Sequence, residues 1–423
     1  MTGGTGQPGG TGPWLALVES NTTGTGRQFC AAARQRGLRP VVLAARPERY
    51  PYLELDGVEY EQLDTDDPDR VLAACRQRSA GSGPGLAGVT SSSEYFVATA
   101  ARAARRLALS APDPHTLLRC RDKRRQRQLL ATAGVAVPGF HVARRAAAAV
   151  HAACGLGFPV VVKPVSGSGS VGVRLCPDAE SVHEHSTDLL GRGVDERGRP
   201  VPRAVLVEEY VPGPEYSVET FDGRPIAVVA KQLGPHPHFV ETGHVVPAPI
   251  SCGVTEHLAG TARRALAALG LAWGAAHTEL RLGRTGPVVI EVNPRLAGGM
   301  IPTLVQLATG ADLVDAVVGK AAGRTVRPRP VPVRHAAIQF AVASRPGTVV
   351  AVHGIEQARG RPGVTHAGAL LPPGTPIEIS HSFRDRFGYV VATGPDATTA
   401  VELARRAAGH LHVQTRPTRP EGT

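Results

Sequence analysis

Cysteine, aromatic residues and long apolar runs are all scarce in this chain of 423 residues, and each scarcity excludes a class of protein. The six cysteines lack the close paired spacing that zinc and redox motifs require, so we expect reduced thiols in packing positions. The longest early apolar run extends from Trp14 to Val18, which is too short for a signal-peptide core or a membrane span. We therefore expect a cytoplasmic protein that has no membrane partner.

Positive charge is abundant but widely spread. The chain carries 47 Lys and Arg against 36 Asp and Glu, a formal charge of +11, yet only 4% of its residues are aromatic. Arginines are scattered along the whole length, and the densest cluster covers residues 119–127. Because such scatter is typical of a solvated surface that also attracts anionic substrates, we expect no nucleic-acid partner. An acidic carrier protein and a homodimer both stay open as partners.

The most informative segment, residues 277–295, predicts a β-hairpin. Apolar residues alternate on both sides of residues 284–286. A three-residue loop there needs one left-handed residue, which Gly286 supplies. In this hairpin Glu279 lies directly opposite Glu291.

The same register places His277 opposite Asn293. Side chains repeat every second residue along a strand, so Glu279, Glu291 and Asn293 project from one face. Opposed carboxylates repel each other unless a cation lies between them, and hard oxygen ligands suit Mg²⁺ or Mn²⁺. The sequence therefore predicts a metal site on this hairpin. The alternative is a solvated hairpin that carries two surface glutamates.

A second motif, at residues 158–173, predicts a phosphate-binding flap. A β-branched run ends at Lys163 and is followed by a loop of glycines and serines and a second apolar run. This pattern favours two antiparallel strands joined by a flap, whose backbone N–H groups and hydroxyls can face phosphate oxygens. It is not a Walker loop, because no Gly-Lys-Ser/Thr follows the glycines. An ordinary turn is the alternative.

Lysine is rare, and its positions are informative. Only four of the basic residues are lysine: Lys123, Lys163, Lys231 and Lys320. Since surface cations in this chain are arginines, the remaining lysines mark places that need a compact, flexible ammonium, although we interpret Lys320 as a chance survivor. Residues 205–219 then predict a strand, a proline/glycine bend and a second strand. Such a bend can offer backbone groups to an adenine edge.

In this order, the motifs resemble the ATP-grasp superfamily over roughly residues 119–320. The resemblance implies ATP and two Mg²⁺ (or Mn²⁺) ions as cofactors. Glu208 would accept from the adenine amino group, the backbone of Glu209 and Val211 would contact the base, and Glu215 would hold the ribose. The implied nucleotide contacts are Lys123, Lys163, Ser166, Gly167, Ser168, Gly169, Glu208, Glu209, Val211 and Glu215. The implied metal ligands are Glu279, Glu291 and Asn293.

Within that superfamily the chain most resembles carboxylate–amine ligases, in particular the L-amino acid ligases that make dipeptides. The resemblance implies that a carboxylate attacks the γ-phosphate of ATP, and that an amine then displaces phosphate from the acyl phosphate. Arg295 would meet the transferred phosphoryl group with Lys163, and His244 or a nearby carboxylate, with a pKa near neutrality, would accept the proton of the amine. The implied substrate residues are Glu94, Glu241, His244, Arg295, Gly298 and Gly299, of which Glu241 and His244 are also counted as catalytic.

Other functions stay open at this point. The acceptor could be ammonia, a hydroxyl or a carrier-protein group, and Glu241 and His244 could simply form a strand and its cap. A biotin-carboxylase-like function is disfavoured by the segment 237–247, which resembles an amino-acid site. A non-catalytic nucleotide-binding subunit is the alternative from another class. The intact set of lysines, metal ligands and Arg295 argues against it.

The predicted fold class is α/β, with an α+β lid and C-terminal part. Resemblance implies an ATP-grasp fold that follows a Rossmann-like N-terminal domain and precedes a small C-terminal domain. The proline-rich segment 326–332 predicts a stiff linker before the last domain. The predicted boundaries are a disordered tail at 1–13, an N-terminal α/β domain at 14–118, an ATP-grasp domain at 119–325 with its lid at about 134–207, a C-terminal domain at 333–413 and a tail at 414–423.

Overall fold

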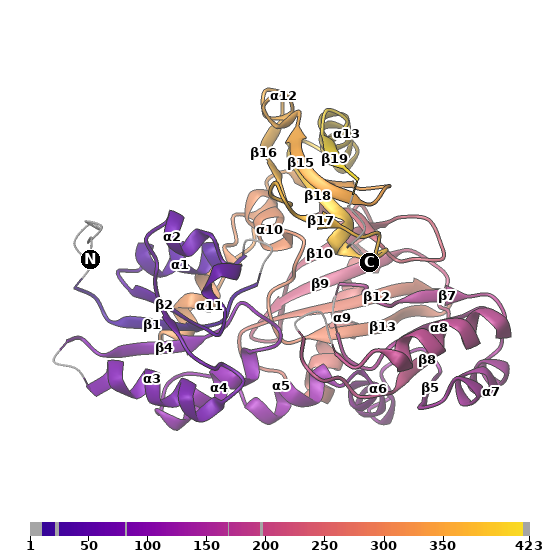
Figure 1. Ribbon diagram of the computed structural model, residues 1–423, viewed down its shortest axis with the longest axis horizontal. Helices are drawn as coiled ribbons and strands as arrows, with labels where there is room; N and C mark the ends of the chain where they lie inside the picture. Colours follow the sequence, from indigo (N-terminus) through magenta and orange to yellow (C-terminus); the bar gives the residue numbers. More distant parts are fainter. Residues whose placement is uncertain (1–10, 22–24, 81–82, 168, 195–197, 418–423) are drawn as a thin grey trace.

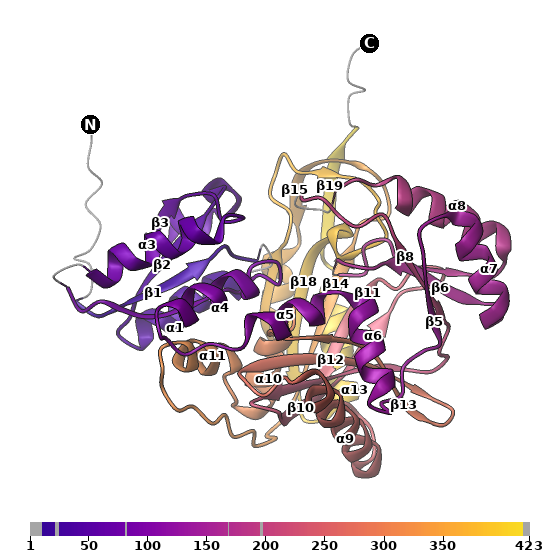
Figure 2. The same ribbon diagram turned by 90° about the horizontal axis from the view of Figure 1, so that it is seen from below.

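The computed structural model describes residues 11–21, 25–80, 83–167, 169–194 and 198–417. Most of the predicted N-terminal tail, Ser168 of the predicted flap and residues 418–423 lie outside these ranges. Figures 1 and 2 show an N-terminal α/β unit at one end, a lid at the other and a C-terminal unit that projects between them.

The N-terminal unit is built on a parallel sheet with the strand order β3-β2-β1-β4. Strands β1, β2 and β4 are short and largely apolar, whereas the edge strand β3 is polar and mostly exposed. Helices cover both faces, which is the arrangement that a parallel sheet requires. The predicted parallel α/β unit is therefore present. Its elements are β1 (Trp14–Val18), α1 (Thr25–Gln35), β2 (Arg39–Ala44), the 3-10 turn η1 (Pro47–Arg49), α2 (Tyr52–Leu55), β3 (Glu59–Gln62), α3 (Pro68–Ala80), β4 (Leu86–Thr90) and α4 (Val97–Arg106).

Two helices lead from this unit to the lid. Asp122 ends α5 and caps α6, since its side chain accepts from the backbone N–H of Arg125 at 3.1 Å. The lid is a four-stranded sheet with the order β5-β8-β6-β7, covered by two helices. The elements are α5 (Pro114–Arg121), α6 (Lys123–Thr132), β5 (Phe140–Ala143), α7 (Ala146–Leu156), β6 (Val160–Pro164), β7 (Arg174–Cys176), α8 (Ala179–Gly191) and β8 (Val205–Glu209).

The predicted flap is confirmed in part. β6 and β7 are antiparallel and the glycine-rich loop joins them, as the sequence predicts. The second strand, however, begins at Arg174 rather than in the apolar run at 171–173, which forms a turn. Ser170 and Gly172 take positive φ angles there, and this conformation cannot continue a strand.

An eight-stranded sheet forms the centre of the molecule, with the order β13-β12-β9-β10-β11-β14-β18-β16. Its last three strands come from the segment predicted as a separate C-terminal domain, so that segment extends the central sheet by backbone pairing. Helix α9 packs on one face, while α10 and α11 share an apolar core with α1 of the N-terminal unit. The elements are β9 (Glu215–Phe221), β10 (Arg224–Leu233), β11 (Glu241–Val246), α9 (Cys252–Leu269), β12 (Ala275–Gly283), β13 (Gly286–Asn293), α10 (Ile301–Thr309) and α11 (Leu313–Ala321).

The C-terminal part adds a three-stranded sheet, β17-β15-β19, to its strands in the central sheet. β19 extends to Arg416, so the strand occupies three residues of the segment predicted as a tail. The elements are β14 (His335–Val342), β15 (Gly347–His353), α12 (Ile355–Arg359), β16 (Val364–Ala369), β17 (Pro376–Ile377), the 3-10 turn η2 (Phe383–Asp385), β18 (Arg386–Gly394), α13 (Ala397–Ala408) and β19 (His412–Arg416).

The hairpin β12–β13 has the predicted side-chain register and a shorter turn. Glu279 pairs with Glu291 and His277 with Asn293, as the sequence predicts. Gly283 pairs with Gly286, so the turn holds two residues rather than the predicted three. A register shift after Glu279 absorbs the difference, and Gly286 has φ of 129°, a conformation that favours glycine.

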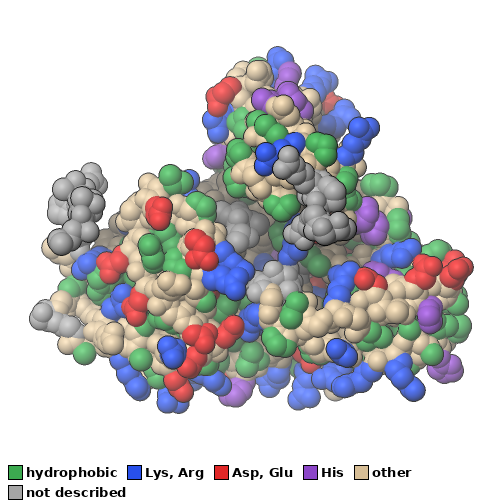
Figure 3. Space-filling model, viewed as in Figure 1, with side chains coloured by type: hydrophobic (Ala, Val, Ile, Leu, Met, Phe, Trp, Pro, Cys, Tyr) green, Lys and Arg blue, Asp and Glu red, His purple; other side chains and the backbone are tan. Residues whose placement is uncertain are grey.

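Further expectations from composition meet mixed outcomes. All six cysteines are free, as expected. The expectation that they occupy packing positions is wrong for Cys154 and Cys252, which are exposed. Lys and Arg side chains are dispersed over the face seen in Figure 3 rather than gathered in one patch. Within the described ranges, no single helix is long and apolar enough to cross a membrane. Only the pair α10 and α11, bent by 108°, passes that test of length and composition together.

Candidate active site

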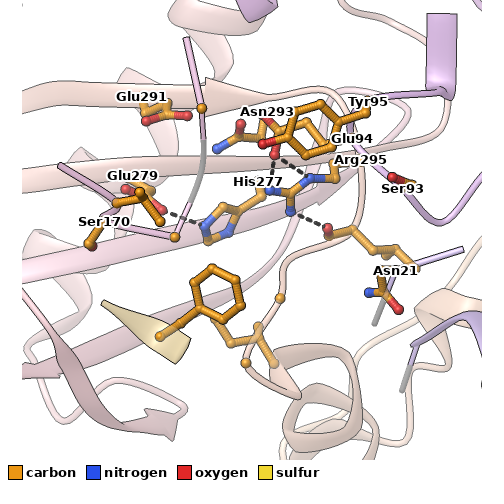
Figure 4. Close-up of a pocket in the computed structure, with 18 of the residues that line it drawn as sticks. Asn21, Ser93, Glu94, Tyr95, Ser170, His277, Glu279, Glu291, Asn293 and Arg295 are labelled. Carbon is orange, nitrogen blue, oxygen red and sulfur yellow. Dashed lines mark hydrogen bonds and ion pairs between the residues drawn. The ribbon is translucent and has the colours of Figure 1, made fainter. Parts of the chain in front are cut away.

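One cavity of about 780 Å³ collects nearly every predicted site residue. The lid, the central sheet, the N-terminal unit and the C-terminal part all contribute to its wall. Of the predicted residues that the structure describes, only His244 does not line it. Figure 4 shows the centre of this cavity, with residues of the hairpin β12–β13 beside Arg295.

The metal face of the cavity is formed by Glu279, Glu291 and Asn293. The opposed carboxylates are each neutralised by a lysine: Glu291 accepts from Lys123 at 2.7 Å, and Glu279 from Lys231 at 3.1 Å. Although burial opposes it, Lys231 holds the pKa of Glu279 well below its usual range. An ionised carboxylate with a facing carboxylate and amide is the oxygen donor set that Mg²⁺ prefers.

This face does not resemble a transition-metal site. Within the described part of the chain, no three His, Cys, Asp or Glu side chains gather as they would around zinc or iron. The donor set of two carboxylates and one amide therefore fits a hard cation that keeps part of its water shell, as Mg²⁺ does.

His277 orients one carboxylate of this face, as Figure 4 shows. Its Nε2 lies 3.0 Å from Glu279 Oε1, and its Nδ1 lies 2.7 Å from Oε1 of the buried Glu219. Burial alone would lower the pKa of His277, but the two carboxylates raise it to about 9. The ring is therefore an imidazolium at neutral pH, and it donates to both carboxylates. Sequence analysis placed His277 on the hairpin without giving it this role.

The phosphate side of the cavity has two buried lysines near the flap, Lys123 and Lys163. Lys123 Nζ donates to the backbone oxygen of Gly167 at 3.0 Å and also reaches Glu291. Lys163 Nζ lies 2.5 Å from Glu208 Oε2, while Arg127 Nε donates to Oε1 of the same carboxylate at 2.6 Å. Two ammonium groups are thus aimed at one space under a glycine-rich loop, which is what a polyphosphate requires.

Glu208 has a different environment from the one expected for an adenine contact. It is buried, and both of its oxygens hold cations, so its first observed role is to fix Lys163 and Arg127. Its contact with adenine stays a prediction.

The bend that follows β8 packs tightly on the hairpin, because a Cβ at Gly213 would lie 2.1 Å from the backbone oxygen of Leu282. This close approach brings Val211 to the cavity wall.

Lys231 connects the predicted ribose, substrate and metal residues, and sequence analysis missed its role. Its side chain is 2% exposed, and its ammonium lies 2.9 Å from Glu215, 2.6 Å from Glu241 and 3.1 Å from Glu279. Burial raises the pKa of Glu215, whereas Lys231 holds the pKa of Glu241 low against the effect of burial. The scarcity of lysine could have drawn attention to Lys231. Its partners could not be predicted in this way, because the three glutamates lie on different strands.

Glu94 and Arg295, predicted for different tasks, contact each other. Arg295 Nε donates to Glu94 Oε2 at 3.0 Å and its Nη2 donates to the same oxygen (Figure 4). Although burial opposes it, Arg295 lowers the pKa of Glu94, so the carboxylate stays ionised. The pair lies between the metal face and the N-terminal unit, where Asn21 and Ser93 also line the cavity.

The structure contradicts the expectation that the pKa of His244 lies near neutrality. Its ring is fully buried, and burial lowers its pKa to about 3, so the ring is neutral and weakly basic at pH 7. It lies beneath Gly299, where a Cβ would be 2.7 Å from Nε2 and where φ is 58°. Position 299 therefore requires glycine. At Gly298 a side chain would meet no steric obstacle, because a Cβ there would contact nothing within 4 Å. Glu241, 3.6 Å from the ring, lines the cavity itself.

Comparison with known families adds to this geometry. Residues 156–303 match the ATP-grasp domain family, and residues 339–416 match L-amino acid ligase C-terminal domain 2. The fold is similar to the crystal structure of an L-amino acid ligase from Bacillus licheniformis, with a TM-score of 0.79, 23% identity and coverage of 96% of this chain and 99% of that one. At this level of identity the likeness concerns the fold.

Several curated relatives are similar in sequence. An uncharacterized protein, y4rH, of Sinorhizobium fredii is 40% identical over 93% of this chain and 81% of its own length. Carnosine synthase 1 of Gallus gallus is 33% identical over 47% of this chain, which spans 23% of that protein. Alanine–anticapsin ligase of Bacillus subtilis is 29% identical over 52% of this chain and 51% of its own length. The last two matches thus cover only parts of those proteins.

Proposed function

The chain belongs to the ATP-grasp superfamily, as an enzyme of the L-amino acid ligase type, and from this premise we propose that it joins two amino acid substrates through an acyl phosphate. It forms an amide bond with ATP and Mg²⁺ and releases ADP and phosphate. Names of relatives support this substrate class, since carnosine synthase and alanine–anticapsin ligase both make amide bonds to amino acids.

The observation that carries the proposal is the opposition of Glu279 and Glu291 beside Asn293 in a cavity that also holds Lys123 and Lys163. Phosphoryl transfer requires little covalent participation by the protein. It depends on alignment and on neutralisation of the charge that develops on the transferred group. Carboxylate ligands for a cation, with two ammonium groups on the other side, supply both.

Each residue has a task in this reaction. Bound at the metal face, Mg²⁺ would neutralise phosphate charge, with Glu279, Glu291 and Asn293 as its protein ligands. Lys123 and Lys163 bind the phosphates near the flap and exclude water with it. Arg295, held by Glu94, presents its guanidinium at the boundary between the phosphate and substrate sides, where the carboxylate of the first amino acid must lie.

The amine needs a proton acceptor, and the low pKa of His244 argues against this ring in that role. A ring with a pKa of about 3 is a poor base at pH 7. Glu94 and Glu241 both line the cavity and both stay ionised, so they can hold the ammonium of an amino acid by a charge-assisted contact. We assign amino-group binding to these two carboxylates.

Isotope transfer tests the chemistry directly. The enzyme is incubated with ATP, Mg²⁺ and pooled amino acids to find an active pair, and the carboxylate donor is then labelled with oxygen-18. An acyl-phosphate route places one labelled oxygen in inorganic phosphate, whereas adenylation places the label in AMP. Glu184→Gln, an exposed glutamate on α8, serves as a control for handling and folding.

The products separate the remaining alternatives. ADP together with an amide supports the proposal. AMP and pyrophosphate would overturn both the acyl phosphate and the assigned mechanism. ADP together with an ester or a thioester on a partner would retain the metal face and change the acceptor to a hydroxyl or a carrier protein.

A further inference from the structure

A short turn in the C-terminal part reaches the cavity at two points that the proposed function does not use. This turn, residues 382–386, consists of η2 and the residues on either side of it. Phe383 and Arg386 both line the cavity. Phe383 contacts the glycine-rich flap, and Arg386 contacts Glu241, so one turn connects the nucleotide side with the substrate side.

The contact with the flap depends on a glycine. Gly169 has φ of 67°, and a Cβ there would lie 2.3 Å from Cδ1 and 2.7 Å from Cε1 of Phe383. The backbone N of Phe383 lies 3.5 Å from the backbone oxygen of Gly169. The aromatic ring therefore lies directly on the flap backbone, at a distance that no side chain at this position would permit.

The contact with Glu241 is a set of three hydrogen bonds. Arg386 Nε and Nη2 donate to the backbone oxygen of Glu241 at 3.1 and 2.8 Å, and Nη2 also donates to Oε2 at 3.1 Å. The guanidinium lies 4.0 Å from the ring centroid of Phe340, and the side chain is 7% exposed. Glu241 is thus fixed by Arg386 from one side and by Lys231 from the other.

Hydrogen bonds to Asp385 hold the turn between its two contacts. The buried Asp385 accepts from Ser380 through N at 2.9 Å and Oγ at 2.7 Å, and from the backbone N of Ser382 at 3.4 Å. The backbone oxygen of Asp385 accepts from Ala343 N at 2.7 Å, next to β14. The bonds to Ser380 and Ser382 fold the turn on itself, and the bond from Ala343 attaches it to the central sheet between Phe383 and Arg386.

A neighbouring contact connects the same region with the lid. His381 stacks on His238, with ring centroids 3.8 Å apart, and the preceding Pro237 accepts from the backbone N of Leu175 in β7 at 2.8 Å. The C-terminal part therefore contacts the flap of the lid directly and contacts β7 through the segment between β10 and β11.

We propose that residues 382–386 form a positioning element that couples closure of the flap over the nucleotide to the placement of Glu241 at the amino-acid site. The proposal rests on the proposed function for the identity of these two sites. Its consequence is that the flap closes fully only when the substrate side is ordered, which limits the loss of ATP to hydrolysis.

Release of a fluorescent nucleotide tests the element without knowledge of the amino acids. The probe is N-methylanthraniloyl-ADP with Mg²⁺, and its dissociation rate is measured by stopped flow. Phe383→Ala should accelerate release about tenfold, because an aromatic contact on the flap is lost. Arg386→Lys, which changes the contact with Glu241 rather than the contact with the flap, should accelerate release as well. The double variant should fall well short of the product of the two effects. Val350→Ala, exposed on β15, should match the wild type.

A substitution at Gly169 separates a direct contact from general damage. In the wild-type background, Gly169→Ala introduces both backbone strain at a positive φ and a steric clash with Phe383. In the Phe383→Ala background the clash is absent, and only the backbone strain remains. Gly169→Ala should therefore impair nucleotide retention more in the wild type than in the Phe383→Ala background. Melting temperatures of all variants, compared with Val350→Ala, identify any variant that fails to fold.

Two results would overturn the coupling: release from Arg386→Lys at the wild-type rate, or equal effects of Gly169→Ala in both backgrounds. These outcomes are independent of the isotope experiment. If no amide is formed but release behaves as expected, the proposed function fails and the positioning element remains. If the amide is formed and release does not respond, the reverse holds.

Discussion

The phosphate side and the substrate side of the cavity neutralise their carboxylates in different ways. On the phosphate side, each carboxylate has at least one cation of its own: Glu291 holds Lys123, while Glu208 holds Lys163 and Arg127. On the substrate side, one cation is shared: Lys231 lies within 3.1 Å of Glu215, Glu241 and Glu279. Arg386 also contacts Glu241, and His277 also contacts Glu279.

This difference has a physical consequence. Removal of one cation on the phosphate side leaves one carboxylate to be compensated, and a bound metal or phosphate can rearrange around it. Removal of Lys231 leaves three partly buried carboxylates close together without the cation that they share, and a charge that loses its partner in such a site is costly. The substrate side should therefore depend on Lys231 for folding, while the phosphate side should depend on its lysines mainly for catalysis.

The largest effect is expected for Lys231→Met. This change should lower the free energy of unfolding by about 3–5 kcal/mol, because it breaks a buried ion-pair network from one side. Urea denaturation measures it. Lys320→Met is the matched control, since Lys320 forms a single partly exposed ion pair with Asp222 and should lose less than about 1 kcal/mol. Equal losses for the two lysines would break the comparison.

The hairpin shows how far the sequence alone predicts the site. The pairing of Glu279 with Glu291 follows from alternation along adjacent strands, a local rule, and the structure has it. The turn is one residue shorter than predicted because a register shift after Glu279 is not visible in an alternating pattern. The glycine-rich loop between two antiparallel strands was likewise predicted from the local pattern, and the structure has it.

Contacts between distant segments lay beyond that kind of inference. Arg386 is 145 residues from Glu241, and Arg295 is 201 residues from Glu94. Which cation meets which carboxylate depends on how separate sheets and loops pack, and nothing in the local pattern encodes it. The burial of His244 is a further example, because it follows from the packing of Gly299 and Phe340 on its ring.

The second effect concerns the metal face. Glu291→Gln keeps the size of the side chain and its contact with Lys123 but removes a ligand charge, so the fold should persist. The rate of ADP formation with Mg²⁺ should fall at least about a hundredfold. The melting temperature should stay near that of Glu184→Gln. Full Mg²⁺-dependent turnover in Glu291→Gln would remove this carboxylate from the metal site.

The third effect tests whether the phosphate side needs an ammonium rather than a charge. Lys163→Arg retains the charge, but a planar guanidinium does not replace the compact ammonium that pairs with the buried Glu208. The lost contact to phosphate, worth about 1.5–3 kcal/mol, should slow the reaction tenfold or more. Lys320→Arg is the control. An unchanged rate and ATP affinity would mean that Lys163 serves only to pair with Glu208.

The smallest effect is a pH dependence on the substrate side. The pKa of His244 is about 3 in the folded chain because the ring is buried, against an ordinary value of 6.5. Between these values the unfolded chain binds more protons, so stability must decrease as the pH falls below 6.5. At pH 5.5 the loss should be about 1.4 kcal/mol relative to neutral pH. His244→Asn lacks this titrating group. Between pH 7.5 and 5.5 the unfolding free energy of this variant should therefore fall by about 1.4 kcal/mol less than that of the wild type. Parallel profiles for the two proteins would show that His244 is accessible to protons in the folded state, and would restore it as a candidate base.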